Sequence, residues 1–312
     1  MDSSLSLQGV CNVSGWGVIR AQGADAASFL QGQLTNDILA LNASHARFAG
    51  FCSAKGRLQA SFVVWSEDAD SFLLACSSSL LAPTLKRLSM FVMRAQCRLS
   101  DASGEIALRG ATGLTAEAWI ADADVWARRD RNGATAIRLP DAAGLRRALL
   151  VAPAAVADVA MPAAGLSIEA WRWLDVQSGI VTIEAATVDR FVPQMVNYEI
   201  VGGVDFQKGC YPGQEVVARS QYRGTTKRRT LLFDSDEVAS AGQDVYASAV
   251  AGEPVGTVAS AAARPGQAGG SALVELRLAA LDGSLHLGAI EGPVLRRAEL
   301  PYAVALDAEP IT

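Results

Sequence analysis

The stretch GGVDFQKGCYPGQEVVARSQYRG (202–224) places residues that could do chemistry at close spacing. Its cysteine, Cys210, follows Lys208 and comes two residues before Pro212. Because proline suits the first turn of a helix, we expect a helix over 213–223 with Cys210 just ahead of its N-terminus. The positive end of a helix and the Lys208 ammonium both favour a thiolate there. The spacing therefore predicts a reactive thiol at Cys210.

The same turn also has a purely structural interpretation. Asp205, Lys208 and Glu215 could form a polar network around a tight turn. An isolated cysteine is also most often a small buried core residue. Gly209 and Gly213 would let the backbone approach another chain or a ligand closely. The sequence leaves the structural and the chemical interpretation open.

A cluster of cations follows the cysteine, in a chain that is otherwise acidic. Such a cluster could bind an anion, such as a polyglutamate tail, a phosphate or an RNA backbone. It could equally be a solvated helix face and loop. The cluster consists of Arg219, Arg223, Lys227, Arg228 and Arg229.

Composition excludes several classes of protein. The chain has 312 residues and a net charge of −5, with a pI of about 5.2, which argues against a general binder of nucleic acid or membrane surfaces. Five cysteines without a CxxC pair indicate free thiols in a reducing cytoplasm. Two histidines argue against a metal site built on histidine, and we expect no metal. No apolar run is long enough to span a membrane, and the first residues do not read as a signal peptide.

Apolar periodicity predicts a mixed α+β fold. We expect a strand over 15–22, a helix over 23–38 with Asp25 as its cap, strands over 57–65 and 71–77, a helix over 79–93 and a strand over 95–101. This order of elements is that of a split βαβ unit. Farther along, strands are expected over 105–111 and 146–153, and a helix over 166–179 that begins at Ser167 and ends at Gly179.

The last part of the chain changes character. Short β-like runs separated by Gly, Asp and Pro turns predict a small barrel or sandwich. We place the boundary near residue 229, which gives a domain over 1–229 and a C-terminal β domain over 230–312.

Three stretches together carry a family resemblance. They are KGCYPGQE (208–215), GWGVIRAQGADAASFLQGQLTNDI (15–38), and WRWLDVQSGIVTI through FVPQMVN (171–197). They resemble the YgfZ-type folate-binding proteins, which belong to the superfamily of the glycine-cleavage T-protein, an aminomethyltransferase. The resemblance implies two interleaved α/β subdomains and a C-terminal β-barrel, arranged as a ring around a central folate site.

The resemblance also implies a function and a set of site residues. It implies a monomeric cytoplasmic protein that binds tetrahydrofolate or a polyglutamylated folate. That protein would support the assembly or repair of iron–sulfur enzymes, including those that modify tRNA, with these enzymes or assembly proteins as partners. RNA binding would be weak, and no membrane is expected. Cys210 and Lys208 match the reactive turn. The residues expected to bind folate are Trp16, Trp171, Gln177, Tyr211, Gln214, Glu215 and Arg223.

Two departures from the family pattern bear on activity. The run GRLQASFVVW (56–65) holds no carboxylate where related aminomethyltransferases carry an aspartate beside the reacting nitrogen. Its absence argues against aminomethyl transfer, because a fixed charge is often the largest part of catalysis. Gln177 stands where related sequences have a glutamate, so the pterin loses a charged acceptor there.

Three other functions remain open. The first is a folate-dependent one-carbon transferase that uses another carboxylate, for which Asp175, Glu184, Asp189 and Glu199 are candidates. The second is a cysteine hydrolase with Cys210 as nucleophile, which needs His45 or His286 as base. The third is an RNA-binding module built on the cations of 219–229.

Overall fold

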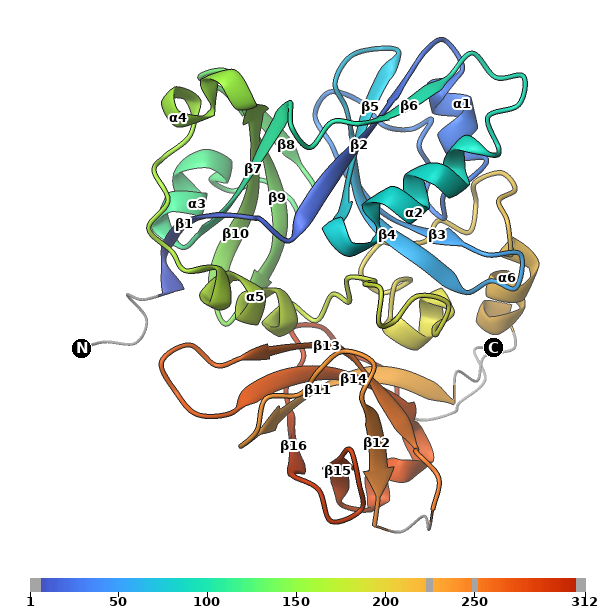
Figure 1. Cartoon of the computed structure of the whole chain (residues 1–312), viewed down its shortest axis with the longest axis vertical. Helices are drawn as coiled ribbons and strands as arrows, with labels where there is room; N and C mark the ends of the chain where they lie inside the picture. The colour runs from blue at the N-terminus through green and yellow to red at the C-terminus, as the bar shows by residue number, and fades with distance from the viewer. Residues whose placement is uncertain (1–6, 223–226, 249–251, 307–312) are drawn as a thin grey trace.

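The chain is arranged as three units around a common centre (Figure 1). The computed structural model describes residues 7–222, 227–248 and 252–306. Two of the units are five-stranded antiparallel sheets with helices, and the third is a closed barrel of six strands. We call them the N-terminal unit, the middle unit and the barrel. This architecture confirms the expected fold class.

The N-terminal unit is a split βαβ sheet. Its strand order is β3-β4-β5-β2-β6, with β5 between β2 and β4. Because β5 runs antiparallel to both neighbours, β2 and β4 are parallel strands joined across it. Strand β3 at the edge was not anticipated from the sequence. The elements are β2 (Trp16–Gln22), α1 (Ala26–Gln31), β3 (Arg47–Cys52), β4 (Leu58–Ser66), β5 (Ser71–Ser77), α2 (Ser78–Ser89) and β6 (Arg98–Asp101).

The edge strand of the middle unit, β1, precedes the N-terminal unit in the sequence. Its strand order is β1-β7-β10-β9-β8, and β1 pairs antiparallel with β7. Because β2 lies in the other sheet, the two units are interleaved, as expected. The elements are β1 (Gly9–Asn12), β7 (Ile106–Thr112), α3 (Leu114–Ile120), β8 (Arg128–Arg131), β9 (Ala134–Ala142), β10 (Leu145–Pro153), a 3-10 turn (Ala154–Val156) and α4 (Ala157–Ala160).

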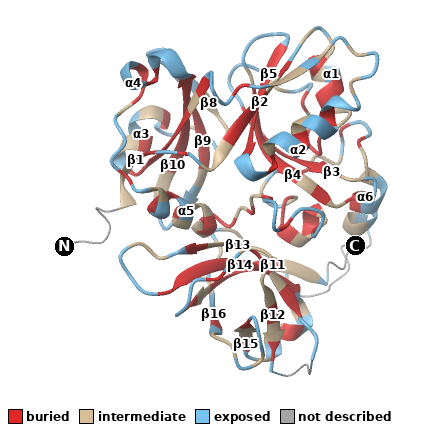
Figure 2. Ribbon diagram, in the orientation of Figure 1, coloured by how far each residue is buried: buried red, intermediate tan, exposed pale blue. Residues whose placement is uncertain are grey.

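The C-terminal strands close into a barrel in the order β11-β14-β13-β12-β15-β16. Closure leaves no unpaired strand edge. Its interior is a separate apolar core around Phe233, Val258 and Val274. Figure 2 shows buried stretches along the strands of the barrel. The elements are β11 (Arg228–Ser235), β12 (Asp244–Ala247), β13 (Gly256–Ala263), β14 (Gly270–Arg277), a 3-10 turn (Leu278–Asp282), β15 (Leu285–Leu287) and β16 (Val294–Ala298).

Helix α5 (Ile168–Gln177) lies where the three units meet (Figure 1). The Ser167 side chain caps it by accepting a hydrogen bond from the Ala170 amide at 3.1 Å, as expected. Gly179 follows the end of the helix with a φ of 73°, a left-handed conformation that favours glycine. The chain then continues through a 3-10 turn (Pro193–Val196) to α6 (Gln214–Tyr222).

The helix expected over 23–38 is much shorter in the structure, and α1 ends at Gln31. Tertiary hydrogen bonds account for the difference. The Thr35 hydroxyl donates to the Gly203 carbonyl at 2.6 Å and accepts from the Gly50 amide at 2.7 Å. These contacts hold the segment after Gln31 in a path of turns and bends, which outweighs a helical propensity of a few tenths of a kcal/mol per residue.

Asp25 also differs from its expected role. It occupies the position before α1, but its side chain makes no capping bond. Its carboxylate accepts a hydrogen bond from the Gln96 amide at 2.7 Å instead, which ties α1 to the loop after α2. In the part of the chain that the structure describes, no helix is long and apolar enough to cross a membrane.

Candidate functional site

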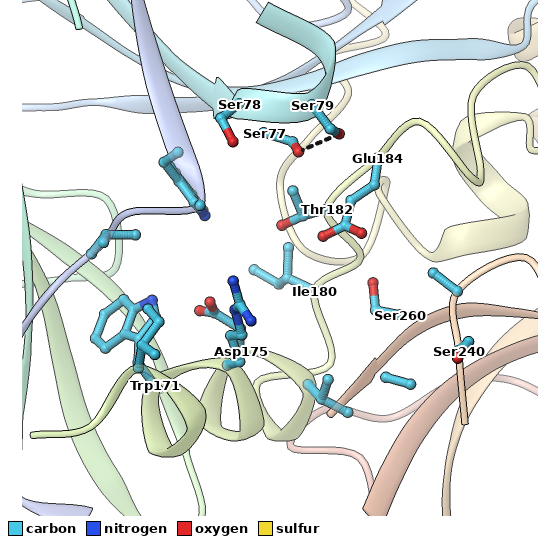
Figure 3. Close-up of a pocket in the computed structure, with 18 of the residues that line it drawn as sticks. Ser77, Ser78, Ser79, Trp171, Asp175, Ile180, Thr182, Glu184, Ser240 and Ser260 are labelled. Carbon is cyan, nitrogen blue, oxygen red and sulfur yellow. Dashed lines mark hydrogen bonds between the residues drawn. The ribbon is translucent and has the colours of Figure 1, made fainter. Parts of the chain in front are cut away.

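A central cavity of about 470 Å³ lies where the three units meet (Figure 3). The N-terminal unit lines one edge with the serines at the start of α2, and α5 lines the opposite edge with Trp171 and Asp175. The loop after α5 contributes Thr182 and Glu184, and the barrel contributes serines. Its polar lining residues include Trp16, Ser77, Ser78, Ser79, Arg172, Asp175, Thr182, Glu184, Ser240 and Ser260.

Trp171 is fixed in the cavity wall by its packing. Its indole lies against Gly110 of β7, where a Cβ atom would come within 2.4 Å of the ring, so glycine is required there. The Arg147 guanidinium lies over the same ring, 4.4 Å from its centroid. Trp171 is only 1% exposed, so it offers a ligand its edge and not a ring face. Its buried Nε1 lies on the Asp175 side and makes no hydrogen bond of normal geometry to any described residue.

The cavity has an uneven distribution of charge. Asp175 forms an ion pair with the buried Arg147. Burial raises the pKa of Asp175, and Arg147 opposes that effect. Glu184 is open to the cavity, yet the protein around it desolvates the carboxylate and raises its pKa too. Arg172 lowers the pKa of both carboxyls, but it makes no ion pair within the described residues.

Three consecutive serines form the edge opposite α5. Ser77 and Ser79 share a hydrogen bond of 2.9 Å between their hydroxyls, and Ser79 also accepts from the Ala185 amide at 3.2 Å. Ser77 precedes the first residue of α2 but makes no capping bond to it. The Ser78 amide at this end of the helix donates instead to the Gly15 carbonyl at 2.9 Å.

An aromatic niche adjoins the cavity on the side of the two sheets. It shares Trp16 and Asp175 with the cavity and adds Phe48 and Trp126. The Phe48 and Trp126 rings stack with centroids 5.6 Å apart. The niche measures about 30 Å³, which is about the share of liquid volume of one water molecule, so a bicyclic ring does not fit without side-chain movement.

The cysteine turn lies elsewhere, at the start of α6. Of the five cysteines, Cys210 alone is exposed. The turn is pressed against the β3–β4 hairpin through two glycines with positive φ, Gly213 and Gly56. A Cβ on Gly213 would lie 2.4 Å from the Ser53 carbonyl oxygen, so only glycine allows this approach. Gly209 has open space around it.

Lys208 anchors the turn to α1. Its Nζ donates to the Leu34 carbonyl at 2.6 Å and also to the Gln31 carbonyl at the end of α1. The side chain is 9% exposed, and burial lowers the pKa of Lys208 to about 8. The ammonium is therefore used mainly to hold two carbonyls, while its charge still lies near enough to Cys210 to interact with it.

Comparison with known proteins finds clear relatives. No model of a known protein family matches the chain. It is 31% identical to the tRNA-modifying protein YgfZ of Serratia proteamaculans, over 74% of this chain and 72% of that protein. It is 34% identical to the tRNA-modifying protein YgfZ of Edwardsiella ictaluri, over 68% of this chain and 67% of that protein. The chain belongs to the YgfZ family.

The fold of this YgfZ-family chain also occurs in a solved structure of another protein. The glycine cleavage system aminomethyltransferase T of Bartonella henselae superimposes with a TM-score of 0.72, over 95% of this chain and 87% of that one. The two are 14% identical, so the likeness shows the fold alone.

The YgfZ fold divides the expected site residues between two places. Trp16 and Trp171 line the central cavity. Gln177 is half-buried and is not among the lining residues. Tyr211, Gln214 and Glu215 lie on the cysteine turn and α6, together with Lys208 and Cys210, and none of them lines the cavity. Arg223 lies outside the described residues.

The cations after the cysteine are largely neutralised. Arg228 pairs with the buried Glu275, and Arg229 pairs with Glu199. Arg219 pairs with Glu215 at 3.2 Å on the surface of α6. Lys227 is the one described member without an ion pair, and a single free cation is weak support for an RNA or polyglutamate site.

Neither the histidines nor the other candidate carboxylates line the cavity. His45 bonds to Ser44 and Asn42, and His286 bonds to Ser284 and Gly292. Within the described residues neither histidine bonds to Cys210, so the hydrolase alternative lacks its base. Asp189 accepts from Ser53 and Gln59, and Glu199 holds Arg229. Only Asp175 and Glu184 of the four carboxylates reach the cavity.

Sequence reasoning missed several cavity residues in this YgfZ-family chain. Arg147 lies in an apolar strand and has no sequence signal that links it to Asp175. Arg172 lies between two tryptophans and was read only as part of a helix. The run Ser77–Ser79 did carry a signal, because serines between a strand and a helix mark a helix start.

Proposed function

We propose that this protein binds tetrahydrofolate or a polyglutamylated folate in the central cavity and supports iron–sulfur enzymes, including those that modify tRNA. The observation that carries the proposal is the cavity itself, which combines indoles, carboxylates and a free guanidinium at the junction of three units. Membership of a family whose members are named tRNA-modifying proteins supports the second half.

The cavity suits a folate in size. Sites for small ligands usually measure about 300–1,000 Å³. The cavity falls in this range at about 470 Å³. Trp16 is half-buried, so it can offer a ring face to a pterin, whereas the buried Trp171 forms the wall beside Asp175. A folate would supply a carrier for one-carbon units there.

The charges match the two ends of a folate. A pterin presents adjacent N–H donors, which a carboxylate accepts well. Glu184 is the better acceptor in the cavity because Asp175 is already engaged by Arg147. Arg172 is the described cation without an ion pair that can meet an anionic tail. Glu184 therefore takes the role that the sequence assigned to the position of Gln177.

Cys210 would serve a partner and not the folate. It is exposed, stands on a turn fixed by Gly213 and Lys208, and is not among the cavity residues. A cluster is held by about four ligands, and in the described residues no three of the His, Cys, Asp and Glu side chains are grouped to bind a metal. We therefore assign Cys210 a transient role, by thiol exchange or by completing the site of a partner enzyme.

The test is a titration with tetrahydrofolate, followed by quenching of tryptophan fluorescence. We expect saturable quenching in the wild type. Trp16→Ala and Glu184→Gln should weaken binding about tenfold, the loss of one charged or stacking contact. Trp171→Phe keeps the ring against Gly110 but removes the Nε1–H, so a smaller loss is expected. A triglutamyl folate should bind more tightly than the monoglutamate, and Arg172→Gln should remove that difference.

Trp119→Phe is the matched control, since Trp119 lies on α3 under Arg131 and away from the cavity. Its affinity should equal that of the wild type. Absence of saturable quenching in the wild type would reject folate binding. Equal losses in Trp16→Ala and Trp119→Phe would show that the ligand lies outside the central cavity.

Aminomethyl transfer remains a second candidate because two carboxyls with raised pKa line the cavity. Against it, Asp175 is neutralised by Arg147, and β4 supplies no carboxylate. We expect no turnover of an aminomethyl donor with tetrahydrofolate. Turnover that is abolished in Glu184→Gln would establish the transferase instead.

A further inference from the structure

The loop after α2 projects an apolar and basic surface that the proposed function does not use. We define the tip as residues 86–98, from the last turn of α2 to the start of β6. Met90, Phe91 and Met93 are 70%, 45% and 87% exposed. Single exposed apolar residues are ordinary, but three within four positions form a patch, and such patches mark interaction sites.

The charge of the tip has one sign. Between Asp70 and Asp101 the sequence has no acidic residue, although the whole chain has a net charge of −5. None of the cations of the tip makes an ion pair with a residue that the structure describes, in contrast to Arg228 and Arg229. Lys86 and Arg87 lie in the last turn of α2, where positive charge stabilises the helix through its dipole. Arg94 lies beyond the helix, so the dipole does not account for its charge. The four exposed cations are Lys86, Arg87, Arg94 and Arg98.

Helix α1 connects the tip with the cysteine turn. At its start, Asp25 and Gln96 exchange two hydrogen bonds of 2.7 and 3.1 Å. At its end, the Gln31 carbonyl accepts from Lys208, two residues before Cys210. Six helical residues span about 9 Å at 1.5 Å each. The attachment point of the tip at Gln96 and that of Lys208, which anchors the Cys210 turn, are therefore separated by about the length of α1. A molecule bound to the tip would lie near the cysteine turn.

We propose that the tip docks an acidic partner protein and sets it beside Cys210. The cations without an ion pair would be attracted to acidic groups on a partner. The exposed apolar side chains would bind in an apolar pocket between those acidic groups. Two of the three apolar side chains are methionines. A methionine has no aromatic ring on which a nucleic-acid base could stack. Its flexible side chain can pack against protein surfaces of different shapes. A protein thus fits better than an RNA. That the partner is an iron–sulfur client rests on the proposed function.

The experiment places a photo-crosslinking residue, p-benzoylphenylalanine, at Met93 of the full chain in a bacterial host that makes iron–sulfur enzymes that modify tRNA. Adducts are identified by mass spectrometry. We expect discrete adducts with one or a few acidic proteins. Arg87→Glu with Arg94→Glu should lower their yield about tenfold or more, because like charges then face each other. The same probe at Val294 of the barrel, with Arg297→Glu, is the matched control and should give no such adduct.

Four results would overturn the docking proposal. They are an adduct that nuclease removes, an adduct of two copies of this chain, equal yields at Met93 and Val294, and no adduct at all. The folate titration separates this proposal from the previous one. The Arg87→Glu, Arg94→Glu variant should bind tetrahydrofolate like the wild type. Failure of the wild type to bind folate would reject the folate site. The docking proposal would still be tested by the adducts at Met93.

Discussion

At the scale of single residues, exposure distinguishes Cys210 from the other cysteines. Burial raises the pKa of Cys11, Cys52 and Cys76 to about 12, and it raises the pKa of Cys97 as well. We expect Cys210 to be alkylated by iodoacetamide near neutral pH at least ten times faster than the other four, since thiolate fraction and access set the rate. Mass spectrometry of a time course would measure all five rates. A Cys97 rate equal to that of Cys210 would contradict the expectation.

Lys208 should make the free energy of unfolding depend on pH. The folded chain releases this proton near pH 8, whereas the unfolded chain holds it up to about 10.5. Between these values the unfolded state binds more protons, so the free energy of unfolding rises with pH. We expect the stability of the wild type to increase from pH 8 to 10 relative to Lys208→Met, measured by urea denaturation. A difference that stays constant with pH would show that Lys208 keeps its ordinary pKa.

The residue scale also shows where sequence reasoning stops. Cys210 on an exposed turn before a helix was predictable, because Pro212 and the following amphipathic run mark the helix start. The use of Lys208 was not, because its partners are backbone carbonyls of Gln31 and Leu34, which every sequence offers alike. The expected grouping of Tyr211, Gln214 and Glu215 with the tryptophans stays a prediction, and the cavity does not support it.

At the scale of elements, the contact between the cysteine turn and the β3–β4 hairpin depends on Gly213. Gly213→Ala would place a Cβ at a φ of 80° and within 2.4 Å of a carbonyl oxygen. We expect a loss of about 2 kcal/mol in the free energy of unfolding, together with a changed alkylation rate at Cys210. Gly209→Ala is the control, since nothing lies within 4 Å of its added Cβ. Similar losses in both variants would mean that the turn is not held by the hairpin.

Regular elements were predicted well where local pattern and tertiary contacts agree. Helix α5 begins after Ser167 and ends before Gly179, as expected, because both capping signals are local. The helix expected over 23–38 is short because Thr35 bonds to Gly203, far along the chain. Strand β3 was missed because it follows a loop without a clear turn signal. Non-local hydrogen bonds therefore explain the main differences.

At the scale of the whole molecule, polar bonds attach the barrel to the α/β units. Arg229 at the start of β11 pairs with Glu199, with side chains 14% and 10% exposed. We expect Glu199→Met to cost about 3 kcal/mol, because it leaves a mostly buried cation unpaired. Arg229→Met with Glu199→Met should cost clearly less, since no charge is stranded. Thermal unfolding of the wild type, both single variants and the double variant would measure this. A double variant as unstable as the sum of the single ones would contradict it.

Two further bonds accompany this pair. Asn197 donates to the Thr230 carbonyl at 2.8 Å, and the Trp173 indole donates to the Ser271 hydroxyl at 3.0 Å. Both connect the segment around α5 to the barrel and so help to fix the width of the central cavity. Local patterns separated the barrel from the first 229 residues, and the family resemblance implied two interleaved subdomains. Neither gave a sign of these connections, because each joins residues far apart in the chain.

The edge strand of the middle unit has a consequence for synthesis on the ribosome. Strand β1 is made before β2, yet its partner in the sheet is β7. The whole N-terminal unit, from β2 to β6, is made in between. The first strand must therefore wait, unpaired, while a complete neighbouring sheet forms, and β10 must also emerge before the middle sheet can close over α5. Assembly of the cavity is thus ordered in time, because β1 is made before the N-terminal unit but can pair only after that unit has been made.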